Sequence, residues 1–140
     1  MMREILFRGK QTDNGEFVQG DLIQLHDGRK FIINNKHGAC IDDKGNFINT
    51  EAPFVCEVIP ETVGQYTGIT DKNGKKVFEG DIVRYKKNPP CKIEYINCQF
   101  VMMWEKFYRD FEDVYDHDME VVGNIHDNPG LLGGADNGKV

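Results

Sequence analysis

Two segments of the chain repeat one turn-and-strand pattern, and this pattern constrains the fold more than any other feature. Residues 12–23 and 70–83 each contain an Asn-Gly pair, an apolar pair, a Gly-Asp pair and then an aliphatic pair. Asn-Gly tolerates positive φ and reverses the chain. The second glycine allows a kink or a close backbone approach, and the aspartate can accept hydrogen bonds from nearby N–H groups. The pattern predicts two related hairpin units with structural roles for Asn14, Gly15, Gly20, Asp21, Asn73, Gly74, Gly80 and Asp81.

The composition agrees with a fold built from strands. The 140 residues include nine Phe, five Tyr and 15 Gly, whereas alanine occurs only at positions 39, 52 and 135. Aromatic residues favour strands, and alanine is the best helix former. We therefore predict a mainly β, β-rich α+β fold: a curled, barrel-like sheet of short hairpins with one short helix near the C-terminus. A single compact domain is expected over residues 1–132, with two lobes meeting near residues 60–65 as an alternative, and a flexible tail over residues 133–140.

Alternation of apolar and polar residues locates the individual strands. The segment 91–104 has apolar residues at every second position from Ile96 to Trp104, which predicts one half-buried strand, with a hairpin turning near Asn97 as the alternative. Further strands are expected at residues 4–9, 16–25 (broken or bulged at Gly20), 30–34, 47–48, 54–59 and 119–126.

Two segments have helical patterns. Apolar residues at Phe107, Phe111, Val114 and Tyr115 follow the spacing of one helix face, so a helix is predicted over residues 105–115. Asn128-Pro129 has the chemistry of a helix start, which predicts a very short helix that holds Leu131 and Leu132.

Composition also limits location and redox chemistry. The formal net charge is −6, and no apolar run approaches the roughly 20 residues of a membrane span. The N-terminus resembles neither a signal peptide nor an anchor, so a cytoplasmic protein without membrane contact is expected. No two cysteines have CxxC spacing, and we predict buried or half-buried thiols at Cys40, Cys56, Cys91 and Cys98.

Charge is segregated along the second half of the chain. Residues 72–92 carry seven bases and two acids, and residues 105–120 carry seven acids and two bases. One interpretation is two solvated surfaces, and another is that the segments complement each other within one molecule or between subunits. A third is a nucleic-acid surface formed by Arg84, Lys86, Lys87 and Lys92, with Tyr85 and Tyr95 available for base stacking.

Catalytic and metal-binding patterns are weaker. Phosphate-loop, Gly-x-Ser-x-Gly and His-Glu-x-x-His motifs do not occur. The turn at Asp71 fails as a calcium loop because Ile69 and Gly80 would occupy ligand positions. His117 lies beside the carboxylates of Asp110, Glu112, Asp113, Asp116, Asp118 and Glu120, which leaves a metal-dependent enzyme as one alternative. We predict no catalytic residue, no cofactor and no metal ligand.

Three segments together resemble the YopX family of phage and prophage proteins. They are residues 62–74 (TVGQYTGITDKNG), 77–83 (VFEGDIV) and 120–129 (EVVGNIHDNP), and Met2 to Arg8 adds a weaker match. The resemblance implies a mainly β fold, an origin on phage or prophage genomes and life in the bacterial cytoplasm. It brings no established activity, catalytic residue or cofactor. Gly130 departs from a more helix-favouring position in the family, which argues against an ordered final helix.

The leading functional hypothesis is a non-enzymatic phage or prophage accessory protein that acts through protein–protein contacts. The partner would be a second copy of the chain, in a homo-oligomer, or another phage or host protein. The alternatives are a nucleic-acid-binding module that uses residues 84–92 and the metal-dependent enzyme around His117.

Overall fold

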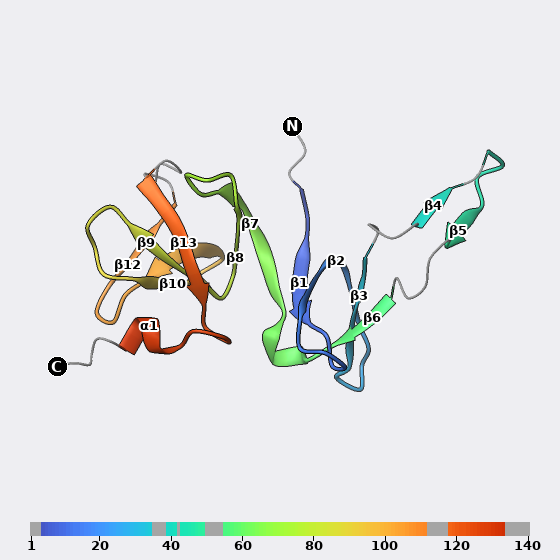
Figure 1. Ribbon diagram of the computed structural model, residues 1–140, viewed down its shortest axis with the longest axis horizontal. Helices are drawn as coiled ribbons and strands as arrows, with labels where there is room; N and C mark the ends of the chain where they lie inside the picture. Colours follow the sequence, from blue (N-terminus) through green and yellow to red (C-terminus); the bar gives the residue numbers. More distant parts are fainter. Residues whose placement is uncertain (1–3, 35–38, 42, 50–54, 112–117, 134–140) are drawn as a thin grey trace. The chain divides into compact units, whose positions relative to one another are not determined.

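Antiparallel strands dominate the computed structural model (Figure 1), which describes residues 4–34, 39–41, 43–49, 55–111 and 118–133. The chain divides into two compact units, residues 2–65 and 66–140, and the division falls inside strand β7 (Gly64–Thr70). The prediction of a mainly β fold with one short helix near the C-terminus is confirmed.

The first unit is a twisted antiparallel sheet with the strand order β6-β3-β2-β1, followed by the start of β7. Val18, Ile32 and Val58 form its buried core. A separate two-stranded pair is formed by β4 and β5. The strand bounds are β1 (Phe7–Lys10), β2 (Phe17–Gln24), β3 (Lys30–Ile33), β4 (Ala39–Ile41), β5 (Phe47–Asn49) and β6 (Val55–Val58).

Strand β2 changes its pairing partner at Gly20. Residues 17–20 pair with β1 and residues 21–24 pair with β3, so one long strand belongs to two successive ladders. The predicted break or bulge at Gly20 is wrong, because β2 is continuous and neither ladder shifts its register. The predicted close approach is present: a Cβ on Gly20 would lie 1.8 Å from the backbone oxygen of Ile33.

The sheet of the first unit curls until β6 meets the end of β1. Ile59 N–H donates to Lys10 O at 2.8 Å, and Thr12 N–H donates to Glu57 O at 3.0 Å. A single bridge joins Gln11 to Val58. The sheet is therefore curled as the sequence predicts, but one bridge is not a continuous ladder and no closed barrel forms in the described residues.

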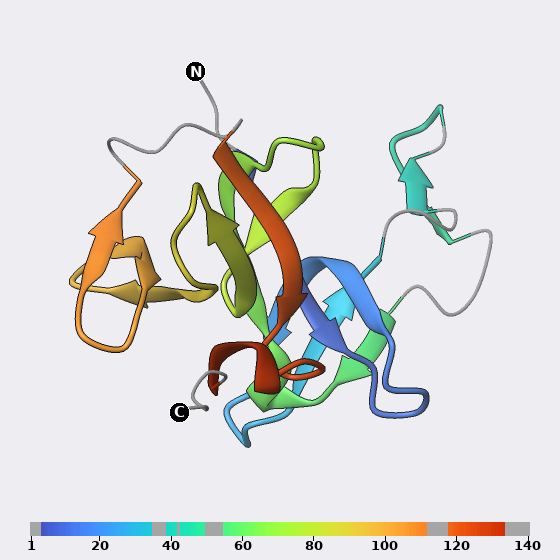
Figure 2. The same cartoon turned by 60° about the vertical axis from the view of Figure 1, so that its left-hand side comes forward.

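The second unit contains a five-stranded antiparallel sheet with the order β12-β11-β10-β9-β13. The remainder of β7 pairs with β8, and Figure 2 shows β13 running beside β9 and leading into the short helix α1. A 3-10 turn, η2 (Pro60–Thr62), precedes β7. The bounds are β8 (Lys76–Phe78), β9 (Asp81–Tyr85), β10 (Cys91–Ile96), β11 (Gln99–Met103), β12 (Tyr108–Asp110), β13 (Met119–Asn124) and α1 (Gly130–Gly133).

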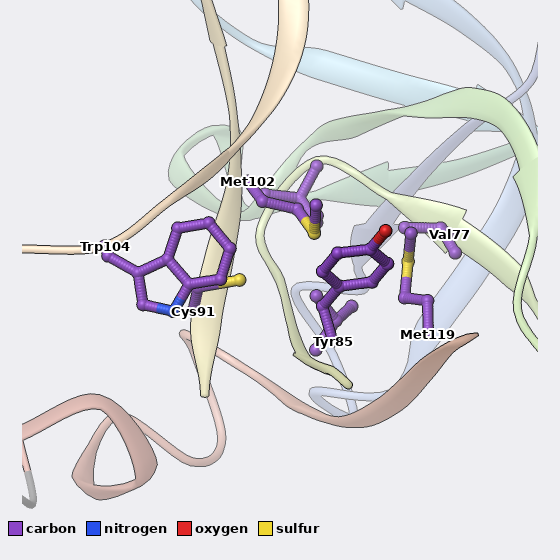
Figure 3. Close-up of a cluster of buried hydrophobic side chains, with 8 residues drawn as sticks. Val77, Tyr85, Cys91, Met102, Trp104 and Met119 are labelled. Carbon is purple, nitrogen blue, oxygen red and sulfur yellow. The ribbon is translucent and has the colours of Figure 1, made fainter. Parts of the chain in front are cut away.

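One face of this sheet carries the main hydrophobic core (Figure 3). Side chains alternate along β9, so that Val83 and Tyr85 point inward while Arg84 is exposed. We call the core side the inner face and the opposite side the outer face. The buried cluster consists of Val77, Val83, Tyr85, Cys91, Ile93, Met102, Trp104 and Met119.

Residues 91–104 form a hairpin and not one strand. Asn97 and Cys98 have φ values of 49° and 67°, the positive pair typical of a two-residue type I′ turn. The hairpin alternative is confirmed and the single strand is wrong. The register pairs Ile93 with Met102, so the inward positions change from odd-numbered residues on β10 to even-numbered residues on β11. The apolar Ile96 and Cys98 hide this change in the sequence, because they extend the alternation of β11 across the turn.

The predicted helix over residues 105–115 is wrong where the structure describes it. Residues 108–110 form β12, and residues 112–117 lie outside the described part. Cross-strand pairing with β11 holds this segment, and the Phe107 ring stacks on Trp104 with centroids 4.8 Å apart.

The argument from Gly130 against an ordered final helix is also wrong. Leu131 N–H donates to Asn128 O at 3.0 Å, and α1 forms. Of the predicted tail over residues 133–140, Gly133 belongs to α1, and residues 134–140 lie outside the described residues.

The two Gly-Asp units differ in structure despite their shared pattern. Both Asn-Gly turns form, with φ of 73° at Gly15 and 80° at Gly74. Gly20, however, lies inside a strand, whereas Gly80 has a φ of 93° in the turn before β9. Asp21 is exposed, but Asp81 is 1% exposed and accepts a hydrogen bond from Phe78 N–H at 2.8 Å.

The cysteine environments differ from one another. Cys56, Cys91 and Cys98 are free thiols; Cys91 is buried, Cys56 half-buried and Cys98 exposed, which corrects the prediction for Cys98. Burial raises the pKa of the Cys91 thiol to about 12. The side chain of Cys40 lies outside the described part. No helix in the described residues is long and apolar enough to cross a membrane.

Tyr85 places a polar group within the core of the second unit. It is 2% exposed, and its hydroxyl has no hydrogen-bond partner among the described residues. A buried hydroxyl without a partner costs about 1–3 kcal/mol. We expect Tyr85→Phe to raise the free energy of unfolding by about 1 kcal/mol, measured by urea denaturation, with the exposed Tyr95→Phe as a neutral control. A loss of stability in Tyr85→Phe would contradict this expectation.

Candidate functional site

The four predicted basic residues lie on β9, the following turn and β10, but they do not form a uniform cationic surface. Arg84, Lys86 and Lys87 are exposed. Lys92 is half-buried, and its Nζ lies 3.2 Å from a carboxylate oxygen of Glu94. Arg84 lies opposite Glu120 in the β9–β13 register. Acidic side chains therefore alternate with the basic ones across this sheet.

The tyrosines proposed for base stacking are not placed for it. Tyr85 is buried in the core, so that prediction is wrong. Tyr95 is 53% exposed and packs edge-on against Phe100, with ring centroids 4.9 Å apart. Because Tyr95 is three residues from Lys92 along β10, the two side chains point to opposite faces of the sheet.

The basic and acidic segments meet within the second unit. Lys72, from the basic segment, lies with its Nζ 3.5 Å from a carboxylate oxygen of Glu120, from the acidic segment. Lys86 N–H also donates to Asp118 O at 3.0 Å. The Lys72–Glu120 ion pair therefore supports complementarity of the two segments within one molecule, whereas the Lys86–Asp118 hydrogen bond joins backbone atoms and does not depend on charge.

The predicted metal site falls largely outside the described residues. His117, Glu112, Asp113 and Asp116 belong to the segment 112–117, and the described acids Asp110, Asp118 and Glu120 lie on or beside the edge strands. No group of three His, Cys, Asp or Glu side chains in the described residues is arranged to hold a metal ion.

A pocket of about 450 Å³ opens on the outer face of β10 and β11. We call it the β10–β11 pocket. Strand β10 supplies a lysine and a glutamate, β11 and the residues after it supply the opposite wall, and α1 supplies a leucine. The lining residues are Pro90, Lys92, Glu94, Met103, Trp104, Glu105 and Leu132.

Strand register explains why these side chains meet. Lys92 pairs with Met103, and Met103 pairs with Tyr108, so the three side chains form one row across the outer face. Leu132 comes from α1, which packs close to β13. A Cβ on Gly123 would lie 2.9 Å from Leu131 Cδ1, so glycine at this position allows the helix to approach.

Trp104 is the fixed wall of the pocket and the sole tryptophan of the chain. It is 8% exposed, and its indole N–H donates to Pro89 O at 2.8 Å. Phe107 stacks on it with an interplanar angle of 15° and is itself 57% exposed. Two aromatic rings thus lie face to face, and the outer ring is available to a ligand.

The strand beside the pocket is the last of its sheet. In the described residues β12 pairs only with β11. Trp104 N–H donates to Phe107 O at 2.9 Å, so this pair is a hydrogen-bonded one. The alternation of antiparallel ladders then directs the backbone groups of Tyr108 outward, away from β11. Tyr108 is also 48% exposed.

The charges of the pocket do not balance. Lys92 and Glu94 form the 3.2 Å ion pair and neutralise each other. Glu105 is exposed, and no described residue forms an ion pair with it. The lining therefore carries one net negative charge beside apolar and aromatic walls.

Sequence reasoning named Lys92 but missed the rest of this pocket. Trp104 was placed in a continuous strand and Glu105 in a helix, so neither was expected in a recess. One local feature of the sequence pointed to this site: the sole tryptophan is followed directly by Glu105, and Phe107 lies three residues after the tryptophan. Aromatic residues at positions i and i+3 also occur on helices, so the pattern alone was ambiguous.

The first unit has a smaller hollow of about 230 Å³ between the β1–β2 turn and β6, lined in part by Asp13, Cys56 and Glu57. Burial and the nearby negative charge of Asp13 raise the pKa of the Cys56 thiol. A thiol that stays protonated is a poor nucleophile. This hollow therefore offers less chemistry than the β10–β11 pocket.

Comparison with known proteins gives a family and a fold. The family model described as YopX protein matches residues 6–133, which confirms the resemblance seen in the sequence. Among solved structures, the chain is similar to the crystal structure of the protein EF1440 from Enterococcus faecalis. The sequence identity is 24%, the TM-score is 0.61, and the match covers 94% of this chain and 99% of that chain. At this identity the likeness shows the fold alone. No curated protein matches the chain.

Proposed function

The chain belongs to the YopX family, and on that premise we propose that it is a non-enzymatic accessory protein of a phage or prophage. It acts in the bacterial cytoplasm through protein–protein contacts, and the contact surface is the β10–β11 pocket with the exposed Phe107 and Tyr108 beside it. The partner is a second copy of the chain or another phage or host protein.

The observation that supports this proposal is the pocket together with the exposed aromatic residues beside it. Phe107 and Tyr108 are 57% and 48% exposed, and both lie next to pocket residues. Aromatic side chains near a recess are typical hot spots of protein interfaces. Because β12 also presents outward backbone groups, a partner could use hydrogen bonds as well as apolar contact.

The pocket chemistry favours binding over proton transfer. Its lysine and one of its glutamates neutralise each other in an ion pair. The remaining walls are apolar or aromatic, apart from the exposed Glu105. Such a lining combines apolar and aromatic side chains with charged groups that can set the orientation of a ligand.

The test is capture of a partner from phage-infected bacteria with a matched pair of variants. The double variant Phe107→Ala/Tyr108→Ala removes the two exposed rings beside the pocket, and Tyr95→Ala removes an exposed ring that packs on Phe100 and does not line the pocket. We expect at least about a tenfold loss of one captured protein in the double variant only. That protein must then bind the purified chain with the same difference between variants.

Equal capture by the two variants would contradict the proposed surface. Far-ultraviolet circular dichroism and thermal unfolding of each variant show that its fold is intact. Light scattering at micromolar concentration, with and without the captured protein, distinguishes a second copy from a different partner. If the unmodified chain forms an oligomer without the captured protein, and the double variant does not, the partner is a second copy of the chain.

Nucleic-acid binding is a second candidate because Arg84, Lys86 and Lys87 are exposed on one strand and its following turn. Phosphate contacts release counterions, so the affinity should fall steeply with salt. Unchanged electrophoretic mobility of single- and double-stranded DNA and RNA at low salt would eliminate this candidate. The interleaved acids and the buried Tyr85 make it the weaker of the two.

A further inference from the structure

We infer that strand β12 pairs edge to edge with β12 of a second copy of this chain, in an antiparallel register that sets the two Tyr108 residues opposite each other. This inference rests on the proposed function, because it assigns the exposed rings beside the β10–β11 pocket to a contact between copies. The outward backbone groups of the edge, its exposed rings and the order of its charges each support it.

The backbone of β12 presents N–H and C=O groups on the side away from β11. In the described residues β12 is the last strand of its sheet and pairs only with β11. The 2.9 Å hydrogen bond from Trp104 N–H to Phe107 O fixes the alternation of this ladder. The backbone groups of Tyr108 and Asp110 therefore point outward. Such an edge is a template for pairing with another strand.

Exposed aromatic rings lie on both faces of this edge. Phe107 and Tyr108 are 57% and 48% exposed. Adjacent residues of a strand point to opposite faces, and the two rings follow this rule: Phe107 stacks on Trp104 of the core, whereas Tyr108 pairs with Met103 on the outer face. A strand added beside β12 would cover both rings at once.

The charges of residues 106–110 select one register. Antiparallel pairing about a two-fold axis can be centred on any of the three residues of β12, and each choice sets outward backbone groups of the two copies opposite each other. An axis at Arg109 sets two guanidinium groups opposite each other, and an axis at Asp110 sets two carboxylates opposite each other. Like charges directly opposite destabilise a sheet. An axis at Tyr108 instead sets Lys106 opposite Asp110 of the second copy, and symmetry repeats this pair.

The same register matches the remaining side chains. Phe107 lies opposite Arg109 of the second copy, a combination that favours a cation–π contact. The two Tyr108 rings form a cross-strand aromatic pair on the outer face. Lys106 and Arg109 are exposed and Asp110 is half-buried, so these side chains lie at or near the surface. The segment is therefore complementary to itself, which is what a two-fold contact between identical chains requires.

The first test is a charge exchange, followed by sedimentation equilibrium of the full chain from micromolar to millimolar concentration. Asp110→Lys sets two lysines opposite each other, and Lys106→Asp sets two aspartates opposite each other. We expect each substitution to weaken the dimer at least about tenfold. The double variant Lys106→Asp/Asp110→Lys reverses both charges and should restore the dimer. Lys87→Asp changes the net charge of the chain as Lys106→Asp does, but in an exposed turn outside β12, and it should leave the dimer unchanged.

The second test needs no substitution. In the dimer Tyr108 N–H donates to the second copy, so its hydrogen exchange should slow as the protein concentration rises. The amide of Lys87, in the exposed turn, should exchange at a rate independent of concentration. If circular dichroism shows that a charge variant does not fold, the exchange of Tyr108 decides the question.

Four results would overturn the inference. They are a monomer at every concentration, a dimer that both single variants leave intact, a dimer that the folded double variant does not restore, and exchange of Tyr108 that is independent of concentration.

The outcome is separable from the test of the proposed function. If the chain is monomeric but capture of another protein depends on Phe107 and Tyr108, this inference fails and the proposed contact surface stands. If the dimer forms in this register but the Phe107→Ala/Tyr108→Ala variant captures another protein as well as Tyr95→Ala does, the inference stands and the proposed surface for other proteins fails.

Discussion

Replacement of Asp71 by alanine is expected to lower the free energy of unfolding by about 3–5 kcal/mol, the cost of breaking a buried charged network. The carboxylate is 3% exposed and accepts three backbone hydrogen bonds. Oδ1 accepts from Asn73 N–H at 2.8 Å and Lys75 N–H at 2.9 Å, and Oδ2 accepts from Val121 N–H at 2.9 Å. One side chain thus holds the β7–β8 turn and attaches it to β13, an edge strand of the five-stranded sheet.

The measurement is urea denaturation, followed by the fluorescence of Trp104 in the same unit. Asp71→Asn keeps the shape of the side chain but replaces one acceptor oxygen with a donor, so it should also be strongly destabilising. Asp27→Ala is the control, because Asp27 accepts a hydrogen bond in an exposed turn and its loss should leave the midpoint nearly unchanged. Stability of Asp71→Ala within the range of this control would contradict the role of Asp71.

Asp71 also predicts the response of the second unit to acid. Although burial opposes ionisation, hydrogen bonds from Val121, Lys75 and Asn73 hold the pKa of the carboxyl group below its ordinary value of 3.8. A pKa that is lower in the folded state stabilises the fold above the unfolded value, and this stabilisation is lost as the pH falls through the folded value. We therefore expect the wild-type protein to lose stability below about pH 4, and Asp71→Ala to show a flatter decline over the same range.

Gly20→Ala is expected to destabilise the first unit by about 4 kcal/mol or more, at the upper end of the effects of single substitutions. The new Cβ would lie 1.8 Å from the backbone oxygen of Ile33 and 2.7 Å from its carbonyl carbon. Backbone atoms cannot rotate away as a side chain does, so β2 and β3 would have to separate at the point where β2 changes partner. Circular dichroism during thermal unfolding should show the loss.

Gly15→Ala provides the graded control for Gly20→Ala. Gly15 has a φ of 73°, but no atom lies within 4 Å of a Cβ at this position. Its substitution should cost only the strain of the left-handed backbone, about 1–2 kcal/mol. If Gly20→Ala lost no more stability than Gly15→Ala, the contact with the backbone of Ile33 would not be the reason for glycine at position 20.

The comparison of sequence with structure shows which inferences depended on local chemistry. The Asn-Gly turns at Gly15 and Gly74 formed with positive φ as predicted, because the turn residues themselves set the backbone angles. Gly20 and Gly80 are both followed by an aspartate and an aliphatic pair, yet one lies in a strand and the other in a turn. The difference arises from the β1 and β3 ladders on either side of Gly20, which the local pattern does not contain.

In the candidate site, too, some features could be inferred from local sequence and others depend on strand pairing. Lys92 was identified from charge alone, but its ion pair with Glu94 and its place in a pocket depend on the register of β10 and β11. Tyr85 was expected at the surface because it lies among basic residues, whereas alternation along β9 directs it into the core. The predicted helix over residues 105–115 is wrong for residues 105–111, which the structure describes, because cross-strand contacts with β11 outweigh helical spacing there.

The mainly β class, the positions of the Asn-Gly turns and the family could all be inferred from the amino-acid sequence, because short-range backbone sterics and residue motifs carry that information. The strand pairing, the buried face of the sheet and the position of the pocket could not be inferred in this way. Those features depend on contacts between residues far apart in the chain, such as the hydrogen bond from Val121 to Asp71 across 50 positions. Such contacts become defined only when the whole sheet packs together.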